Sequence, residues 1–264
     1  MKYGLIGEKL SHSYSKVIHE MITGTEYDIM PIPRDELDSF MKAKAFDGIN
    51  VTIPYKQDVI PYLDDIDEHA RAIGAVNTIV NSGGRLVGHN TDFNGFLYMI
   101  KKHNIDVAGR KVLVLGRGGA SKAIIAVLEY LNAGSIYIVY HKEAEGCISY
   151  EDAFKNHDDA NLIVNTTPVG MFPNVDASPV DLAHFPQCSA VLDIVYNPIE
   201  TKLTKQAKDL NMAAETGLDM LVAQAVYAQE FYQNRKLCSS DEEYRTLIDG
   251  IVEKIIPCYN QKCT

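Results

Sequence analysis

The chain has 264 residues, 46% of them hydrophobic and 23% charged, a composition typical of one large or two modest globular domains. A formal net charge of −10 argues against a nucleic-acid partner, because binding a phosphate backbone needs clustered Lys and Arg. No apolar run approaches the roughly 18 residues of a membrane helix, and the first residues form no signal peptide, so we expect a cytoplasmic protein without membrane contact. Five scattered cysteines and eight histidines lack metal-ligand spacing, and we expect no metal site.

A short apolar strand, Lys2–Ile6, opens the chain, and a polar run then leads into residues at helical spacing from Val17. Ser13 and Ser15 lie on the loop that enters this helix. Their spacing favours a helix cap, a role that serine fills well. Two hydroxyl groups two residues apart also suit a polyhydroxylated ligand, and this alternative stays open.

The next predicted elements are a strand, an amphipathic helix and a second strand, over Glu26–Ile32, Arg34–Lys44 and Phe46–Ile53. Asn50 and Thr52 are two residues apart on the second of these strands, so their side chains share one face. Lys56 follows just beyond the end of that strand. Because ligands of open α/β sheets bind at the carboxyl ends of strands, these three side chains form a candidate polar pocket wall.

Further along, the pattern predicts a helix, a β-hairpin and another helix, over Asp64–Ala75, Val76–His89 and Phe93–Ile100. Gly83-Gly84 forms the hairpin turn, and Asn77 lies on the first hairpin strand. Thr91 and Asp92 directly precede the second helix, and either would serve as its N-cap.

The stretch KVLVLGRGGAS, residues 111–121, predicts a buried strand, a glycine turn and the start of a helix. This arrangement suits a nucleotide, since the turn directs backbone N–H groups and the positive end of a helix at a phosphate. Gly116 would make the tight turn, and Gly118 would let the backbone approach a pyrophosphate. The strict GxGxxG pattern is not met, because Ser121 replaces the third glycine. The candidate contacts are Gly116, Arg117, Gly118, Gly119, Ala120 and Ser121.

The end of the following strand, Ser135–Tyr140, bears on the choice of dinucleotide. An acidic residue there favours NAD by binding the ribose 2′-hydroxyl, whereas basic residues favour NADP. This chain carries His141 and Lys142 at that point, followed by Glu143 and Glu145. The sequence therefore favours NADP, with NAD as the alternative.

The remaining strands and helices alternate, which predicts parallel strands joined by right-handed crossovers. Helices are expected over Tyr150–His157, Thr201–Leu210, Leu218–Asn234 and Asp241–Ile256, and strands over Leu162–Thr167, Ala190–Tyr196 and Met212–Glu215. Asn165, Thr166 and Thr167 end one strand and are expected to line the adenosine side of the crevice. The tail from Pro257 shows no pattern and is expected to be mobile.

Eight blocks together resemble the shikimate dehydrogenase family, in the family's order from about residue 4 to about residue 230. The NVTxPxK, NTD and GxxMLVxQA patterns carry most of the specificity. The blocks are SHSYS (11–15), GINVTIPYK (48–56), GAVNTI (74–79), GHNTDFNG (88–95), LGRGGAS (115–121), NTTPVGM (165–171), DIVYNPIET (193–201) and GLDMLVAQA (217–225).

The resemblance implies an α/β protein with two lobes. One is a substrate-binding and catalytic domain, residues 1–100 plus 218–264, and the other is a Rossmann-type, doubly wound NADP-binding domain, residues 101–217. It implies an oxidoreductase that reduces 3-dehydroshikimate reversibly to shikimate with NADPH, in aromatic amino acid biosynthesis. The family's usual NRT-plus-Arg cluster for the 2′-phosphate is missing, which leaves His141 and Lys142 as the cationic partners.

The resemblance also assigns roles residue by residue. Lys56 and Asp92 match the catalytic pair. The substrate would be bound by Ser13, Ser15, Thr52, Lys56, Asn77, Asp92, Tyr196 and Gln224. Val195, Gly217 and Met220 fall in segments near the cofactor.

Reducing a ring ketone requires a proton at oxygen, and an ammonium beside a carboxylate is a suitable donor pair. Which of Lys56 and Asp92 transfers the proton stays open, as does a monomer or homodimer. One alternative function is a quinate/shikimate dehydrogenase of relaxed specificity that also uses NAD. Another is a cofactor-sensing binding protein without catalysis, against which the retention of both Lys56 and Asp92 argues.

Overall fold

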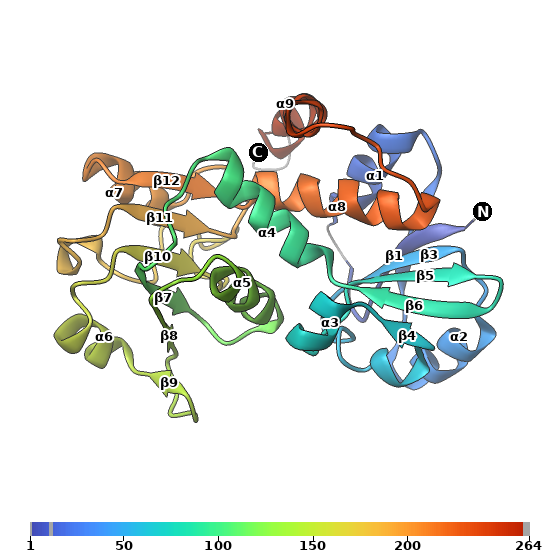
Figure 1. Ribbon diagram of the computed structural model, residues 1–264, viewed down its shortest axis with the longest axis horizontal. Helices are drawn as coiled ribbons and strands as arrows, with labels where there is room; N and C mark the ends of the chain where they lie inside the picture. The colour runs from blue at the N-terminus through green and yellow to red at the C-terminus, as the bar shows by residue number, and fades with distance from the viewer. Residues whose placement is uncertain (1, 11–12, 261–264) are drawn as a thin grey trace. The chain divides into compact units, whose positions relative to one another are not determined.

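The computed structural model describes residues 2–10 and 13–260, and the chain divides into two compact units. Unit 1 comprises Met1–Gly95 and Val222–Glu253, and unit 2 comprises Phe96–Leu221 and the chain from Lys254. Each unit has its own six-stranded sheet (Figure 1). The chain passes between the units within two helices, α4 (Thr91–Lys102) and α8 (Leu218–Gln233), and again within α9 (Asp241–Asn260).

Unit 1 is built on a mixed sheet with the strand order β2-β1-β3-β5-β6-β4. β1 pairs in parallel with β2 and β3, whereas β5 pairs antiparallel with β3 and β6, so the predicted hairpin is present. The strands are β1 (Tyr3–Gly7), β2 (Tyr27–Pro31), β3 (Gly48–Val51), β4 (Asp65–Ile66), β5 (Thr78–Ser82) and β6 (Arg85–His89). The short helices are α1 (Ser15–Thr23), η1 (Arg34–Glu36), α2 (Leu37–Ala43), η2 (Ile60–Tyr62) and α3 (Glu68–Ile73).

Strand alternation divides the core of unit 1 between the two faces of its sheet. On β1, Leu5 packs in one cluster with Tyr27 and with Tyr232 of α8. The next residue, Ile6, packs in a separate cluster that includes Met41 of α2. Helices thus cover both faces of this sheet, α8 on one face and α2 on the other.

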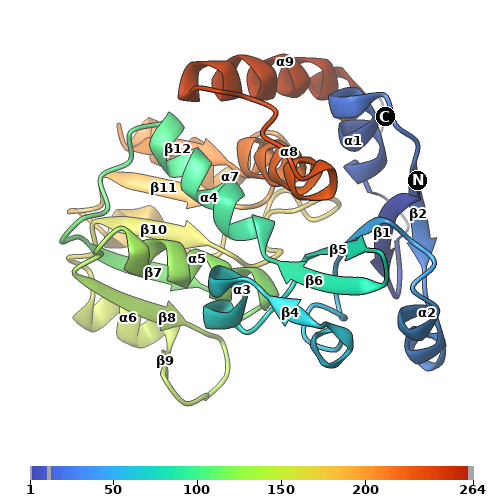
Figure 2. The same cartoon turned by 45° about the vertical axis from the view of Figure 1, so that its right-hand side comes forward.

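Unit 2 is an entirely parallel sheet with the order β9-β8-β7-β10-β11-β12 (Figure 2). Numbered within the unit, this is the 3-2-1-4-5-6 order of a dinucleotide-binding fold, which confirms the predicted Rossmann-type sheet. The strands are β7 (Lys111–Leu115), β8 (Ser135–Val139), β9 (Cys147–Ile148), β10 (Leu162–Asn165), β11 (Ala190–Asp193) and β12 (Ala213–Thr216). The helical segments are α5 (Gly119–Tyr130), α6 (Tyr150–Asn156), η3 (Leu182–His184) and α7 (Lys202–Asp209).

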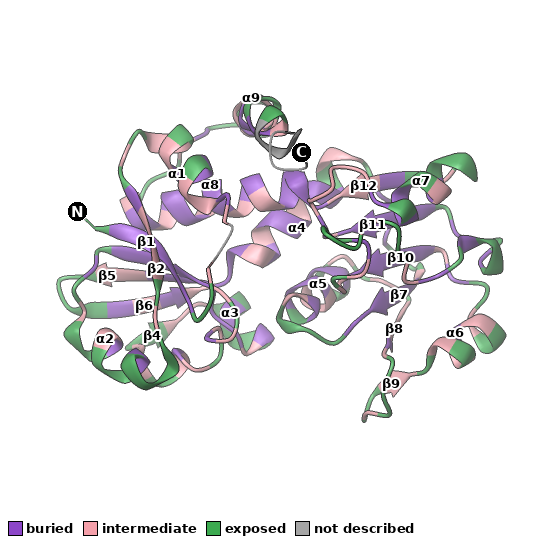
Figure 3. Ribbon diagram, turned by 180° about the vertical axis from the view of Figure 1, so that it is seen from behind, coloured by how far each residue is buried: buried purple, intermediate pink, exposed green. Residues whose placement is uncertain are grey.

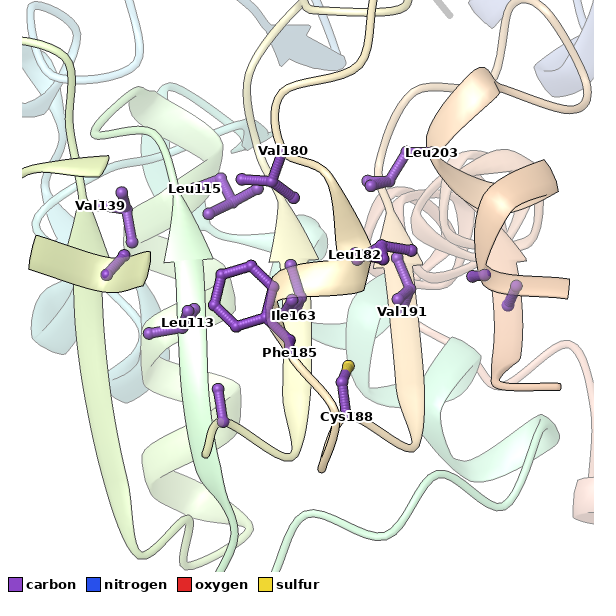
Figure 4. Packing of buried hydrophobic residues seen from close by; sticks show 14 residues of the cluster. Leu113, Leu115, Val139, Ile163, Val180, Leu182, Phe185, Cys188, Val191 and Leu203 are labelled. Carbon is purple, nitrogen blue, oxygen red and sulfur yellow. The ribbon is translucent and has the colours of Figure 1, made fainter. Parts of the chain in front are cut away.

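The central strands of this sheet, β7, β10 and β11, are buried (Figure 3), as expected for a parallel sheet covered on both faces. On one face, the ring of Phe185 lies between Leu113 of β7 and Ile163 of β10 (Figure 4). Phe185 is fully buried, so it fixes two neighbouring strands at the switch point of the sheet, where β7 meets β10.

The acidic stretch from Asp64 differs from its predicted helix. Residues Asp65–Ile66 form β4 beside β6, and α3 begins only at Glu68. The reason is that two aspartates bond backbone amides instead of continuing a helix. Asp64 Oδ2 accepts from Leu86 N at 2.7 Å, and Asp67 Oδ1 caps α3 by accepting from Ala70 N at 2.7 Å.

Other differences concern short or terminal segments. The two-residue strand β9 was not predicted from the sequence, and the helix expected from Arg34 starts as the 3-10 turn η1. The last helix does not stop at Ile256, because α9 continues through Pro257 to Asn260; the rest of the tail expected to be mobile lies outside the described residues. No helix in the described ranges is long and apolar enough to cross a membrane.

Candidate active site

The structure brings the side chains of Lys56 and Asp92 together in unit 1. Lys56 follows β3, where its carbonyl accepts from Val76 N at 2.8 Å, and Asp92 lies in the first turn of α4. Lys56 Nζ donates to Asp92 Oδ2 at 2.5 Å. Both side chains are mostly buried, at 16% and 14% exposure, so solvent screens their attraction less than at an open surface. The pair is an ammonium–carboxylate group suited to proton transfer.

A buried hydrogen-bond network centres on Asn77 and includes Thr91, which directly precedes Asp92 in the sequence. Its Oδ1 accepts from Thr91 N at 2.7 Å and lies 3.1 Å from Thr78 Oγ1 and 3.2 Å from Thr91 Oγ1. Thr91 Oγ1 also lies 3.4 Å from Gln224 Oε1 of α8. The Nδ2 group of Asn77, the donor half of the amide, takes no part in these bonds. The network therefore orients Asn77 and joins it through Thr91 to the predicted site residue Gln224.

Thr91 belongs to this site through its bonds to Asn77, although its sequence position predicted only a helix cap. Neither Thr91 nor Asp92 caps α4, because the helix already includes both. The cap-type bond comes from Asn90, whose Oδ1 accepts from Phe93 N at 3.4 Å. The only signal for Thr91 in the sequence was its place directly before the catalytic-candidate aspartate.

Asn50 does not belong to the pocket wall that was predicted with Thr52 and Lys56. It is 5% exposed, and Oδ1 accepts from the hydroxyl groups of Tyr27 at 2.7 Å and Tyr232 at 2.8 Å. Its Nδ2 donates to the Asn77 carbonyl at 3.2 Å and to Thr78 Oγ1 at 3.0 Å. All four hydrogen-bonding positions of the amide are thus used internally.

The two serines near the first helix stand next to its start, and neither is the N-cap. That position is held by Tyr14, without a side-chain cap bond, and Ser15 is the first residue of α1. Ser13 Oγ accepts from Ser15 N at 3.2 Å. Thr52, half-buried after β3, lies against Gly7, where a β-carbon would approach Thr52 Cγ2 to 2.7 Å. Ser11 and His12 of the SHSYS block lie outside the described residues.

In unit 2, the glycine turn follows β7 at the switch point of the sheet. Gly116 has φ +104°, and a β-carbon there would lie 2.8 Å from Thr166 Oγ1 and 2.9 Å from Thr167 Cγ2. Gly118 has an ordinary extended backbone with open space around its Cα. It also occupies the N-cap position of α5 without a side-chain bond, so the first amides of that helix are not capped by a side chain. The Ser121 hydroxyl turns inward and donates to the Gly118 carbonyl at 2.7 Å.

The residues after β10 hold the neighbouring turn in place. Asn165 is fully buried, and its Oδ1 accepts from Thr167 N at 3.0 Å and Thr167 Oγ1 at 2.7 Å. Its Nδ2 donates to Asp193 Oδ1 at 2.9 Å. Thr166 Oγ1 donates to the Leu115 carbonyl at 2.7 Å. The Asn165 side chain therefore supports the turn from inside, and Thr166 and Thr167 form its half-buried surface.

The carboxylate of Asp193, the last residue of β11, accepts hydrogen bonds from several neighbouring groups. It also accepts from Val195 N at 3.0 Å and from Thr201 Oγ1 at 2.8 Å. Burial nevertheless raises the pKa of this carboxyl to about 6, against the lowering effect of the three bonds.

The remaining candidates lie after β8, β11 and β12. His141 and Lys142 are exposed just beyond β8. Val195 and Met220 are buried, at 5% and 7% exposure, and Tyr196 is half-buried, which raises the pKa of its phenol. The amide of Gly217 donates to the Val195 carbonyl at 3.0 Å, linking the ends of β11 and β12. All these residues follow carboxyl ends of strands, where ligands of such sheets bind. Within residues 2–10 and 13–260, no group of three or more His, Cys, Asp and Glu side chains is arranged to hold a metal ion.

Comparison with known proteins places this arrangement in a family. The family model for the shikimate dehydrogenase substrate binding domain matches residues 5–79. The shikimate dehydrogenase (NADP(+)) of Clostridium beijerinckii is 39% identical over 251 residues, which cover 89% of this chain and 93% of that protein.

Two solved structures extend the similarity to the fold. A chorismate mutase/shikimate 5-dehydrogenase fusion protein from Clostridium acetobutylicum superposes with a TM-score of 0.90 at 35% identity, covering 98% of each chain. Shikimate 5-dehydrogenase from Thermus thermophilus, solved in complex with NADP(H) and shikimate, gives 0.82 at 28% identity, covering 95% of this chain and 99% of that one. The resemblance seen in the sequence motifs is thereby confirmed, and the chain belongs to the shikimate dehydrogenase family.

Proposed function

We propose that this protein is an NADP-dependent oxidoreductase that interconverts 3-dehydroshikimate and shikimate in the shikimate pathway. The single observation that carries the proposal is the mostly buried Lys56–Asp92 pair in a chain whose relatives are NADP-dependent shikimate dehydrogenases. We assign substrate binding to residues of unit 1, among them Ser13, Ser15, Thr52, Asn77 and Gln224. We assign cofactor binding to the glycine turn and the neighbouring strand ends of unit 2.

The glycine turn of unit 2 fits a dinucleotide. Open space at Gly118 and the uncapped start of α5 leave backbone N–H groups accessible to a pyrophosphate. The exposed His141 and Lys142 provide positive charge where an NADP 2′-phosphate would lie, one strand away. NADPH, when bound, supplies the hydride.

The proton comes from this chain. As hydride reaches the ring carbon, negative charge grows on the carbonyl oxygen, and one proton must arrive there to give the alcohol. The ammonium of Lys56 carries N–H donors, whereas an ionised carboxylate only accepts, so Lys56 Nζ is the proton donor and Asp92 orients it. In the reverse direction, the neutral amine takes the proton back from the alcohol. Asn77, held by Thr91 through its Oδ1, directs its Nδ2 donor to a hydroxyl of the substrate.

The test is a spectrophotometric assay with shikimate and quinate, each against NADP and NAD. We expect turnover with shikimate and NADP to exceed the other combinations. Lys56→Met should lower kcat by about 10²–10⁴-fold, the usual contribution of general acid–base assistance. The matched control is Lys42→Met, which removes an exposed ion pair with Asp38 in the same unit. A Lys56→Met enzyme with wild-type kcat would contradict the assignment, and absence of turnover in every combination would favour a binding protein.

A further inference from the structure

A compact group of charges lies where the end of α4 meets the start of α8, entirely within unit 2. Lys102 Nζ donates to Asp219 Oδ1 at 2.8 Å, and His103 Nε2 lies 2.6 Å from Asp219 Oδ2. His103 Nδ1 lies 3.0 Å from Glu215 Oε1 of β12. We call these four residues the Asp219 cluster. The Asp219 side chain is only 11% exposed, and both of its oxygens are bonded to cations.

The geometry requires His103 to be protonated, because both of its ring nitrogens face carboxylate oxygens and each must donate. Burial disfavours the imidazolium, but the bonds to Asp219 and Glu215 outweigh that effect and raise the pKa of His103 to about 9. With Lys102 charged, the cluster holds two positive and two negative groups. Loss of the imidazolium proton leaves a net negative charge beside mostly buried side chains, which weakens the cluster.

The cluster fixes one particular segment, Gly217–Met220, to the end of α4. Asp219 is the second residue of α8, where a carboxylate also interacts favourably with the helix dipole. The amide of Gly217 donates to the Val195 carbonyl, and a β-carbon at Gly217 would come within 2.1 Å of the Ile194 carbonyl oxygen. The segment is therefore bonded to the chain directly after β11 through Gly217 and to the end of α4 through Asp219.

The position of this segment after β12 indicates which half of a bound dinucleotide it would lie near. It follows the carboxyl end of β12, on the same edge as the glycine turn after β7. In a sheet of this order, the adenosine half of a dinucleotide lies over β7 and β8, and the other half lies over the β10–β12 side of the switch point. The Gly217–Met220 segment is thus on the nicotinamide side.

We propose that Asp219 is a positioning residue for the cofactor, which holds the Gly217–Met220 segment in place for the nicotinamide half of NADPH through its bonds to His103 and Lys102. This inference rests on the proposed function. It differs from a purely stabilising role of the ion pairs, because it couples the charge state of the cluster to the affinity for NADPH.

The test compares Asp219→Ala and Asp219→Asn with the wild-type chain in direct NADPH titrations followed by the fluorescence of the reduced nicotinamide. Asp219→Ala should raise the Kd for NADPH about tenfold, which corresponds to a loss of about 1.4 kcal/mol of binding free energy. Asp219→Asn, which keeps one acceptor oxygen, should give a smaller increase. With NADPH saturating, the KM for the second substrate should stay unchanged. The control is Asp159→Ala, which removes an ion pair with Lys111 at the amino end of β7, whereas the Asp219 cluster lies at the carboxyl end of β12.

A pH series adds a readout that a merely structural role would not produce. The charged groups bonded to His103 are Glu215 from β12 and Asp219 from α8, and Lys102 from α4 is bonded to the same Asp219 carboxylate. The Kd for NADPH of the wild-type protein should rise as the pH increases through about 9, where His103 loses its proton. The Asp219→Ala protein should bind weakly at every pH without this step.

The outcomes separate the inference from the proposed function. If wild-type protein binds no NADPH, the proposed function fails, and this inference fails with it. If wild-type protein binds NADPH and Asp219→Ala binds it equally well, the inference alone is overturned, whatever happens to stability. Weaker binding that recovers partly in Asp219→Asn, with an unchanged KM for the second substrate, supports it.

Discussion

Replacing Gly116 and Gly118 separately by alanine would test two roles of the glycine turn, the backbone conformation at Gly116 and the close approach of the cofactor at Gly118. At Gly116, φ is +104°, and a β-carbon would lie 2.8 Å from Thr166 Oγ1 and 2.9 Å from Thr167 Cγ2. Neither threonine can yield easily, because Thr166 Oγ1 is bonded to the Leu115 carbonyl and Thr167 to Asn165. Backbone strain and overpacking together should lower the free energy of unfolding by roughly 2–5 kcal/mol in Gly116→Ala.

Gly118→Ala is the matched variant with the opposite expectation. Gly118 has φ −80° and ψ −177°, and nothing lies within 4 Å of an added β-carbon. Its free energy of unfolding should therefore change by no more than about 1 kcal/mol. If the pyrophosphate approaches this backbone, however, the added methyl group should weaken NADPH binding at least about tenfold, which corresponds to about 1.4 kcal/mol.

Both quantities can be measured on the same samples. Because the chain contains no tryptophan, urea unfolding is best followed by circular dichroism, and NADPH fluorescence can be titrated without a tryptophan background. A Gly116→Ala protein with the wild-type urea midpoint would refute the conformational argument. Wild-type NADPH affinity in Gly118→Ala would refute the close approach of the pyrophosphate.

Three further predictions concern the core, the pH dependence of stability and the cofactor. Phe185→Ala should lower the free energy of unfolding by about 3–5 kcal/mol, because Phe185 is fully buried on the face of the sheet over β7 and β10. A loss below about 1 kcal/mol in urea unfolding would show that the site collapses. The pKa of His103 is raised to about 9 in the folded state, so the stabilisation that its imidazolium provides is complete below about pH 6.5 and is lost as the pH rises through 9. The full contribution is up to about 3 kcal/mol of the free energy of unfolding. Unfolding midpoints should therefore fall over this pH range in the wild-type protein and much less in His103→Gln. The double variant His141→Ala with Lys142→Ala should raise the Kd for NADPH several-fold, the effect expected when an exposed charge contact is lost, and should leave the Kd for NADH unchanged. An equal rise in the Kd for NADPH and the Kd for NADH would contradict a contact with the 2′-phosphate.

The parallel sheet of unit 2 could be predicted well from the sequence because its signals are local. The run Val112–Leu115 is apolar, the glycine turn follows at once, and strands then alternate with helices. The same local reasoning missed β9, since two residues carry no periodicity. The helix predicted from Asp64 was wrong because Asp64 bonds the backbone amide of Leu86, which is 22 residues further along the chain.

The residues of the candidate site could be predicted where sequence motifs name them, but not where their role depends on partners that are distant in the sequence. Lys56 and Asp92 were named as a pair from the family motifs, and the structure brings their charged ends together. Asn50 was misjudged because alternation gives the face of a strand but not the two tyrosine hydroxyls that occupy its carbonyl oxygen. His103 and Asp219 are 116 residues apart, and no pattern in the sequence connects them.

The parallel sheet of unit 2 also has a practical consequence for the design of labelled or immobilised enzyme. Every unit 2 residue proposed here to contact the cofactor lies at or beyond the carboxyl end of a strand, so the amino-end turns carry none of the proposed binding groups. Exposed positions on these turns, such as Asn132 and Asp158, are therefore suitable points for a fluorescent label or a surface tether. A probe attached there would report on unit 2 without occupying the carboxyl-end side of the sheet, where we propose that the cofactor binds.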